Sequence, residues 1–294
     1  MTADVAQRVR QAAETLGYEV NPAGRSLRLR STETVGLVIA DITNPFFPSL
    51  VKALEDALAG QELGLLLADA SNNVARERDA VQRLLARRVD ALVVTPVSRS
   101  GSRGTISEAA ARCPVVQLDR RASSDAHYVG MDNVAAIQSV LLHLSTTGKR
   151  RPVFVGSDPQ ISTTWERQRA FARFAPFGDR VLVGEFSLDW GRTATREALA
   201  RWPSTDAIVC ADDLIAAGAV EELAVLGVPV PATVAVVGFD DTLLSRLQTP
   251  PMSSVRQPLL EMAVAAVALA AGPVTSPRKL LHRGQLVVRA STLS

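Results

Sequence analysis

Residues 34–47 read TVGLVIADITNPFF and join two different patterns. Residues 35–40 form a continuous apolar run, which is typical of a strand buried on both faces of a parallel sheet. Polar and aromatic side chains follow, and apolar positions then recur at helical spacing over 46–59. A buried strand that leads directly into an amphipathic helix is the repeating unit of α/β proteins. This stretch therefore predicts a parallel sheet covered by helices.

The same strand–helix unit recurs along the rest of the chain. Further apolar runs predict strands at 64–68, 91–95, 115–118, 152–156, 181–186, 207–211, 234–239 and 285–288. Amphipathic patterns predict helices at 74–88, 134–146, 163–174, 192–201, 214–226 and 257–271. Because so many strands exceed one comfortable sheet, we predict an α/β chain with two doubly wound, Rossmann-like or flavodoxin-like lobes.

Length and composition agree with two globular lobes. The chain has 294 residues, 47% of them hydrophobic and 21% charged, which excludes a disordered chain and a fibre. The longest wholly apolar run, 262–271, is too short to cross a bilayer, and the N-terminus lacks the apolar segment of a secretory signal. We therefore expect a cytoplasmic protein with no membrane partner. With a net charge of +2, any contact with nucleic acid must come from a local basic patch.

Polar and aromatic side chains follow many of the predicted strands. The candidates are Asn44, Phe46, Asp119, Asp212 and Asp240 after strands, with Arg167 and Trp190 near the starts of helices. In open α/β sheets, ligands bind beyond the carboxyl ends of the strands. Carboxylates and amides can bind vicinal hydroxyls, and an aromatic face can cover a sugar or a base. Together these residues favour a neutral polyhydroxy ligand. Taken singly, an Asp at such a position is more often a helix N-cap, and a Trp more often packs in the core.

The motifs of common enzyme classes are missing from the sequence. It contains no G-x-S-x-G, G-x-x-x-x-G-K-[ST], G-x-G-x-x-G or H-E-x-x-H segment. His127, His143 and His282 lie neither at the spacing of a metal motif nor beside a candidate nucleophile. We therefore expect a binding protein rather than an enzyme, with no metal and no cofactor.

Residues 1–33 have a different character. An amphipathic pattern over 3–16 predicts a short helix, and NPAGRSLRLR at 21–30 can begin a second one, with Asn as N-cap and Pro in the first turn. Three side chains of this second segment are candidate DNA contacts: Arg25, Leu27 and Arg28. In a minor groove, the arginines would bind phosphates and the leucine would wedge between bases. On composition alone, a solvated basic linker is the simpler interpretation.

Several motifs, in this order, resemble the lactose-repressor family of transcriptional regulators. They are TVGLVIADITNPFF itself, RRVDALVVTP at 87–96, VGMDN at 129–133, VAVVGFDD at 234–241 and TPPMSSVRQP at 249–258. The similarity extends over residues 2–291. It implies a periplasmic-binding-protein type I fold in a homodimer, in which a small ligand changes the arrangement of the lobes and thereby the spacing of two DNA-binding headpieces.

The resemblance also implies domain boundaries and site residues. It assigns 1–33 to a headpiece remnant and hinge helix, 34–157 plus 252–275 to the N-terminal lobe, and 158–251 plus 276–294 to the C-terminal lobe. It places Asn44, Phe46, Asp119, Arg167, Trp190 and Asp240 in the effector pocket. Asp212 stands where family members usually have Asn, and an ionised Asp can only accept hydrogen bonds.

The function expected from these features is that of a ligand-responsive repressor. Its effector would be a sugar or sugar derivative, with a nucleoside as the second candidate because Phe46 and Trp190 could sandwich a base. Its other partner would be operator DNA, bound by a full-length form. Residues 3–16 resemble only the third helix of the family's headpiece, so we expect residues 1–294 alone to bind DNA poorly. The alternatives are a periplasmic-type sugar-binding protein and an effector-binding protein without DNA activity.

Overall fold

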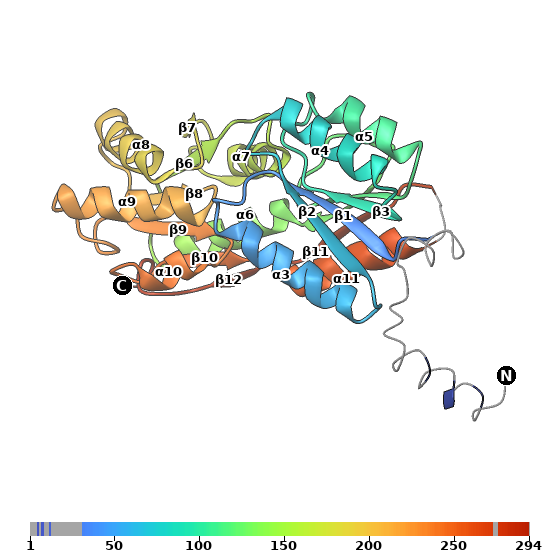
Figure 1. Cartoon of the computed structure of the whole chain (residues 1–294). Coiled ribbons are helices and arrows are strands. Elements are labelled where there is room, and N and C mark those ends of the chain that lie inside the picture. Colours follow the sequence, from blue (N-terminus) through green and yellow to red (C-terminus); the bar gives the residue numbers. More distant parts are fainter. Residues whose placement is uncertain (1–4, 6, 9–11, 13–30, 273–275, 294) are drawn as a thin grey trace.

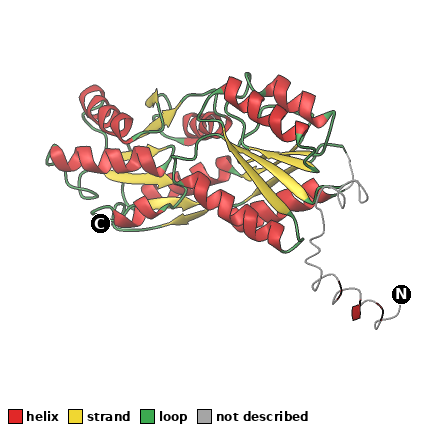
Figure 2. Ribbon diagram, viewed as in Figure 1, coloured by secondary structure: helices red, strands yellow, loops and turns green. Residues whose placement is uncertain are grey.

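The computed structural model describes residues 5, 7, 8, 12, 31–272 and 276–293. The expected hinge segment, with Arg25, Leu27 and Arg28, lies outside these residues. Within them the chain forms two α/β lobes arranged end to end, each built on one six-stranded sheet (Figure 1). Helices flank the strands of both sheets (Figure 2). The predicted pair of doubly wound lobes is thus confirmed.

The first sheet is entirely parallel and has the strand order β11-β5-β4-β3-β1-β2. Its strands are β1 (Thr34–Ile39), β2 (Gly64–Asp69), β3 (Ala91–Val94), β4 (Val115–Leu118), β5 (His127–Met131) and β11 (Lys279–His282). Its helices are α3 (Phe46–Ala59), α4 (Val74–Ala86), α5 (Arg103–Ala110) and α11 (Leu259–Ala271). The apolar runs of β3 and β4 are buried along their whole length, as expected for strands covered on both faces.

The second sheet has the order β12-β10-β9-β8-β6-β7, and all of its pairs are parallel except β10 with β12. Its strands are β6 (Pro152–Ser157), β7 (Val181–Gly184), β8 (Ala207–Cys210), β9 (Ala235–Phe239), β10 (Ser253–Arg256) and β12 (Gln285–Val287). Its helices are α6 (Asn133–Thr146), α7 (Ser162–Phe174), α8 (Leu188–Arg201), α9 (Asp213–Val225) and α10 (Leu243–Leu247).

Helices α8 and α9 approach each other closely because each has a glycine at their contact. A Cβ on Gly218 would lie 2.1 Å from the carbonyl oxygen of Leu188, and one on Gly191 would lie 2.2 Å from that of Ile215. Any larger side chain would therefore collide with the backbone of the facing helix. The absence of side chains at these two positions sets the distance between the helices.

The chain crosses between the lobes three times, and the crossings do not fall at the predicted boundaries. The boundary predicted at residue 157 is wrong, because α6 and β6 already belong to the second lobe. The boundary predicted at 252 is also wrong, because β10 hydrogen-bonds beside β9 in the second sheet. The one predicted at 276 is wrong as well, since β11 pairs with β5 at the edge of the first sheet. Each of these errors concerns strand pairing between segments far apart in the sequence.

Five elements were not predicted, namely β5, β10, β11, α5 and α10. Three of them lack the expected pattern: β10 reads SSVR, only two of the four residues of β11 are apolar, and α5 contains Gly104. Tertiary hydrogen bonding and burial hold these segments in place despite their weak local preference. Within the described ranges, no helix is long and apolar enough to cross a membrane.

Candidate functional site

The strand ends of both lobes converge on a small pocket at the seam between them. Its described lining consists of Asn44, Phe46, Phe47, Asp119, Arg120, Thr163, Arg167, Phe186, Asp212, Asp240 and Gln257. The structure therefore brings together six of the seven candidate ligand-binding residues and leaves Trp190 apart. In this arrangement of the lobes the cavity is only about 20 Å³, roughly the space of one water molecule.

Asn44 connects the two lobes across the pocket. Its side-chain Nδ2 donates to Oδ2 of Asp212 over 3.1 Å, and its Oδ1 accepts from the backbone amide of Phe46 at 3.0 Å. The second bond fixes the loop after β1 and begins α3. Asp212 in turn caps α9, because its Oδ1 accepts from the amide of Ile215 at 2.9 Å. Asp212 is thus both the helix cap that its position predicted and a pocket residue.

Arg167 is fixed at the base of the pocket by its own contacts. The side chain is 3% exposed and lies 4.3 Å from the centre of the Phe239 ring. Its Nε donates to Oδ1 of Asn133 over 2.8 Å, and its Nη1 donates to the carbonyl of Ala211. These contacts hold a permanent positive charge beside the pocket carboxylates.

The three pocket aspartates are buried close together, which disfavours their ionised form. Burial raises the pKa of Asp119 to about 6, against the attraction of Arg120 and Arg167. Burial and the charge of Asp240 raise the pKa of Asp212 to about 7. Burial also raises the pKa of Asp240, although Arg167 and a bond from Gln257 Nε2 at 2.7 Å oppose this shift.

Arg120 directly follows Asp119 in the sequence and is not one of the candidate ligand-binding residues, yet it lines the pocket. It is 4% exposed, and its Nε and one Nη have no hydrogen-bond partner among the described residues. Its guanidinium lies 5.2 Å from the ring centre of Phe47 and 5.8 Å from that of Phe186. On the acceptor side, Oε1 of Gln257 is also unpaired. The pocket thus offers unsatisfied donors and an unsatisfied acceptor to one bound molecule.

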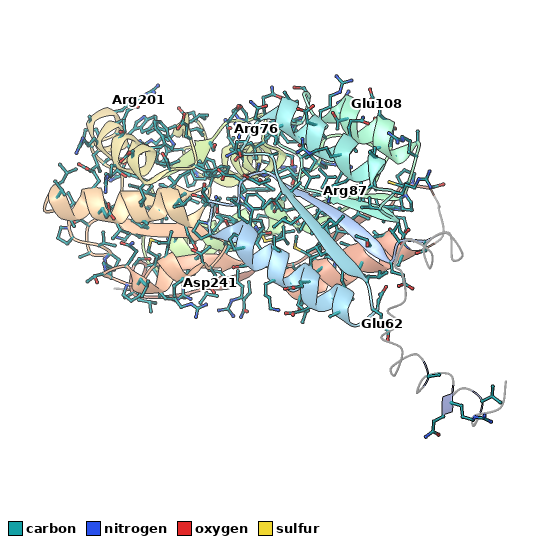
Figure 3. The ribbon with its side chains drawn as sticks, viewed as in Figure 1. Glu62, Arg76, Arg87, Glu108, Arg201 and Asp241 are labelled. Carbon is teal, nitrogen blue, oxygen red and sulfur yellow. The ribbon has the colours of Figure 1, made fainter. Side chains whose placement is uncertain are left out.

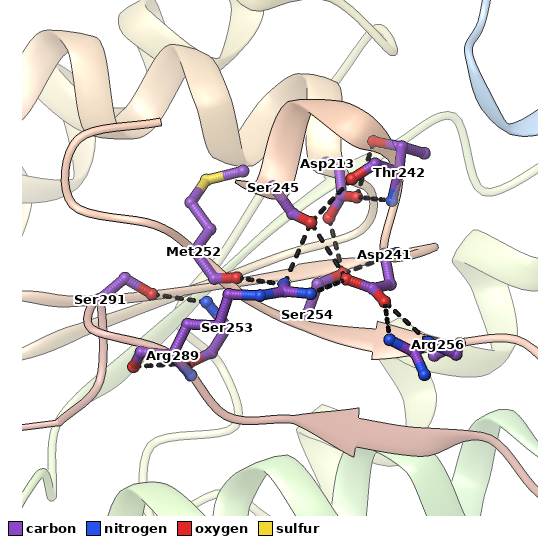
Figure 4. Close-up of polar contacts among 10 residues, drawn as sticks. All are labelled: Asp213, Asp241, Thr242, Ser245, Met252, Ser253, Ser254, Arg256, Arg289 and Ser291. Atoms are coloured by element: carbon purple, nitrogen blue, oxygen red, sulfur yellow. Dashed lines mark hydrogen bonds and ion pairs between the residues drawn. The ribbon is translucent and has the colours of Figure 1, made fainter. Parts of the chain in front are cut away.

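The turn that carries Asp240 is held in an unusual conformation by its neighbour. Asp240 and Asp241 have φ angles of 96° and 50°, in the left-handed region that residues with a Cβ seldom adopt. Figure 4 shows the Asp241 carboxylate between two arginines. Arg256 Nε donates to Oδ2 at 2.7 Å, and Arg289 donates to Oδ1. Although burial alone would raise the pKa of Asp241, the bonds from Arg289 and Arg256 keep it below its ordinary value.

A second buried carboxylate supports the same turn from α9. Asp213 accepts from the amide and the hydroxyl of Thr242 at 2.7 and 2.8 Å, and from the hydroxyl of Ser254 at 2.7 Å. Burial raises its pKa well above the ordinary value. Asp213 therefore joins α9, β10 and the Asp240 turn into one unit (Figure 4).

Trp190 lies in α8 and is not among the described lining residues of the pocket. Its indole Nε1 donates to the carbonyl of Gly156 at 2.9 Å, and its ring packs against Gly184 and the core of the second lobe. Because its polar atom is satisfied by the backbone, Trp190 has the packing role that is usual for a single Trp. Phe186, at the end of the predicted strand 181–186, supplies the aromatic face of the second lobe instead.

The histidines and cysteines lie elsewhere. Nδ1 of His127 accepts from the amide of Arg278, Nε2 of His143 bonds the hydroxyl of Thr292, and Cys113 and Cys210 are free thiols. In the part of the chain that the structure describes, no group of three His, Cys, Asp or Glu side chains could hold a metal ion.

Comparison with known proteins agrees with this architecture. Residues 32–267 match the family model described as periplasmic binding proteins and sugar binding domain of the LacI family. The chain is 32% identical to the transcriptional regulator GalR of Salmonella typhimurium, over 97% of this chain and 86% of that protein. It is similar to the structure of a CelR–cellobiose complex (28% identity, TM-score 0.78, 99% of this chain and 91% of the other). It also shares the fold of a lac repressor dimer bound to operator and an anti-inducer (20% identity, TM-score 0.86, 100% of this chain and 92% of the other).

Proposed function

Because the chain belongs to the LacI family of ligand-responsive transcriptional regulators, we propose that its central pocket binds a sugar or sugar derivative that controls binding to operator DNA. One observation carries the choice of ligand. The pocket combines buried carboxylates with a buried arginine, Arg120, whose Nε and Nη1 have no hydrogen-bond partner among the described residues. A molecule with several hydroxyls can satisfy both kinds of group, because each hydroxyl donates one hydrogen bond and accepts others.

The geometry favours a sugar over a nucleoside. Hydroxyls would donate to Asp119, Asp212 and Asp240 and accept from Arg120, while the rings lining the pocket would cover the apolar face of the ligand. The base sandwich expected of Phe46 and Trp190 does not form around this pocket, because Trp190 is not among its described lining residues. Three carboxylates need several donors, and a sugar carries a hydroxyl on almost every carbon, whereas a nucleoside confines its hydroxyls to the ribose.

Effector binding is coupled to the arrangement of the lobes. Small-molecule sites usually measure roughly 300–1,000 Å³, whereas this pocket measures about 20 Å³. A sugar can therefore enter only if the lobes move apart, which breaks the bond from Asn44 of the first lobe to Asp212 of the second. Such a movement would change how the segment before residue 34 is presented in each protomer of a homodimer.

Thermal-shift and calorimetric titrations with sugars, sugar derivatives and nucleosides test the effector. We expect stabilisation by a sugar that follows RT ln(1 + [L]/Kd), about 2.7 kcal/mol at a hundredfold excess over Kd. Asp240→Asn should weaken its binding roughly tenfold or more, because a charge-assisted hydrogen bond contributes about 1.5–3 kcal/mol. Asp56→Asn is the control, since the Asp56 side chain lies on the exposed face of α3 and pairs with the exposed Lys52 at 2.8 Å. Stabilisation by nucleosides alone would contradict the proposal.

The DNA-binding part of the proposal concerns residues 1–33 and a cytoplasmic homodimer. We propose that Arg25, Leu27 and Arg28 contact a minor groove when two protomers bind one operator. Selection of bound fragments from random-sequence DNA, with and without the sugar, tests this. A chain with a complete helix-turn-helix headpiece joined before residue 1 should enrich one palindromic sequence, and the sugar should alter that enrichment. Residues 1–294 alone should bind DNA poorly. If the chain with the complete headpiece binds the sugar but enriches no sequence, an effector-binding protein without DNA activity is favoured.

A further inference from the structure

A second and larger cavity lies at the seam between the lobes, beside the effector pocket. Its volume is about 550 Å³, within the range of small-molecule binding sites. The first lobe contributes Arg99, Arg103 and Arg121, and the second lobe contributes Gln160, Ser162 and Trp165. The cavity therefore has a wall from each lobe, and its arginines all lie on one of them.

The charge of this cavity is unbalanced. Asp125 is the one carboxylate among its described lining residues, and it already accepts hydrogen bonds from Ser107 at 2.7 Å and from other serines. Arg121 pairs with Glu166 at 2.9 Å. Arg99 and Arg103 form no ion pair with any residue that the structure describes, and they donate only long bonds, 3.4 Å, to backbone carbonyls. Arg99 thus faces the cavity with no carboxylate paired to it among the described residues, and Arg103 has only the longer-range attraction of Asp125.

The other lining groups complement an anion. Ser100, Ser123, Ser124 and Ser162 bring hydroxyls to the wall. Helix α7 begins there, and its N-cap residue Ile161 gives no side-chain cap to the first-turn amides. Guanidinium groups, hydroxyls and free amides at a helix N-terminus are the donors that bind phosphate oxygens in proteins.

Arg99 is also held in position for such a contact. Its guanidinium lies 3.9 Å from the ring centre of Trp165, and its backbone amide donates to the carbonyl of Gln160 at 2.7 Å. An arginine stacked on an aromatic ring keeps its N–H groups free at the edge of the guanidinium plane. Arg99 therefore reaches across the seam from the first lobe while its donors remain available.

We propose that this cavity is a binding site for a phosphate group, carried by inorganic phosphate or by a phosphate ester of a small metabolite. It is separate from the effector pocket and does not depend on the identity of the sugar. Its volume leaves room for an organic part beside the phosphate. Arg99 and Arg103 provide the charge, and Ser162 with the start of α7 receives the anion on the opposite lobe.

An anion at this position would stabilise the present arrangement of the lobes. Arg121 donates its backbone amide to Oγ of Ser162 at 2.9 Å, so the two walls are already in contact. The neighbouring residues Arg120 and Thr163 line the effector pocket. Because adjacent residues line the two cavities, a ligand in one cavity that favours one lobe arrangement also changes the affinity of the other cavity for its own ligand. The effect is reciprocal: each ligand changes the affinity for the other by the same factor.

Isothermal titration of the full chain at constant ionic strength tests the proposal, with sodium phosphate and a hexose 6-phosphate as separate probes. We expect saturable binding at one site per chain. Equal affinities would assign recognition to the anion alone, and tighter binding of the ester would identify an ester as the ligand. Arg99→Gln with Arg103→Gln should weaken binding at least tenfold. Arg103→Gln alone, at an exposed side chain, should weaken it severalfold without any effect on folding.

The matched control removes two positive charges from the same lobe. Arg87→Gln with Arg112→Gln changes exposed arginines at the C-terminal ends of α4 and α5, away from the cavity (Arg87 is labelled in Figure 3). This variant should bind both probes within about twofold of the original chain. Equal weakening in both double variants would overturn the proposal, because it would indicate general electrostatic attraction. Absence of saturable binding of both probes would overturn it as well.

Discussion

The buried ion pairs of Asp241 should stabilise the second lobe and keep Asp240 in the effector pocket. The Asp241 side chain is 1% exposed and contacts Arg289, 16% exposed, and Arg256, 52% exposed. Removal of one member of a buried pair costs roughly 3–5 kcal/mol. Because water can hydrate the half-exposed Arg256 again, we expect Asp241→Asn to lower the free energy of unfolding by about 2–4 kcal/mol. Asn tolerates the left-handed conformation of this position, so the change isolates the lost charge.

The three tryptophans make this effect measurable. Trp165, Trp190 and Trp202 all belong to the second lobe, so urea titration followed by tryptophan fluorescence reports on that lobe. Asp189→Asn is the control, because Asp189 pairs with Arg192 at 2.8 Å but is 89% exposed. That variant should lose less than about 1 kcal/mol. If both variants lose the same free energy, the argument from burial is refuted. If Asp241→Asn keeps its stability, the ion pairs do not hold the turn.

Three further outcomes follow from burial, packing and the position of Trp190. Burial raises the pKa of Asp212 to about 7, so the folded state keeps a proton that the unfolded chain releases near pH 4, and stability should fall between about pH 4 and 7. This pKa difference accounts for a loss of up to roughly 4 kcal/mol in the free energy of unfolding across that pH range. Asp212→Asn should reduce the loss, as measured by urea titrations repeated at several pH values. Gly218→Ala should destabilise the second lobe by about 1–3 kcal/mol, because the new Cβ would meet a backbone carbonyl of α8. Gly104→Ala has open space around it and should stabilise the first lobe by up to about 1 kcal/mol. Thermal denaturation measures both effects. Trp190→Phe removes a hydrogen bond to Gly156 and should cost about 1 kcal/mol of stability with no change in the Kd of the effector; a Kd raised tenfold would show a direct ligand contact instead.

Much of the fold was predictable because the relevant signals are local. Continuous apolar runs identified the buried strands β3, β4, β8 and β9, and helical spacing identified the helices between them. The polar β10 gave no such signal, since its place beside β9 depends on hydrogen bonds to a distant segment. Pairing of β11 with β5 and of β12 with β10 likewise depends on which sheet edge is open, so the positions of the three crossings between the lobes required the tertiary structure.

For the site, the sequence by itself determined that the residues after successive strands would meet, because the carboxyl ends of parallel strands share one edge of a sheet. That rule correctly grouped Asn44, Asp119 and Asp240. It could not determine side-chain direction, which the packing of neighbours sets: Trp190 turns into the second lobe, while Arg120 turns into the pocket. The basic cavity was decided by the tertiary structure alone, because its two walls come from different lobes and meet only when the lobes are in contact.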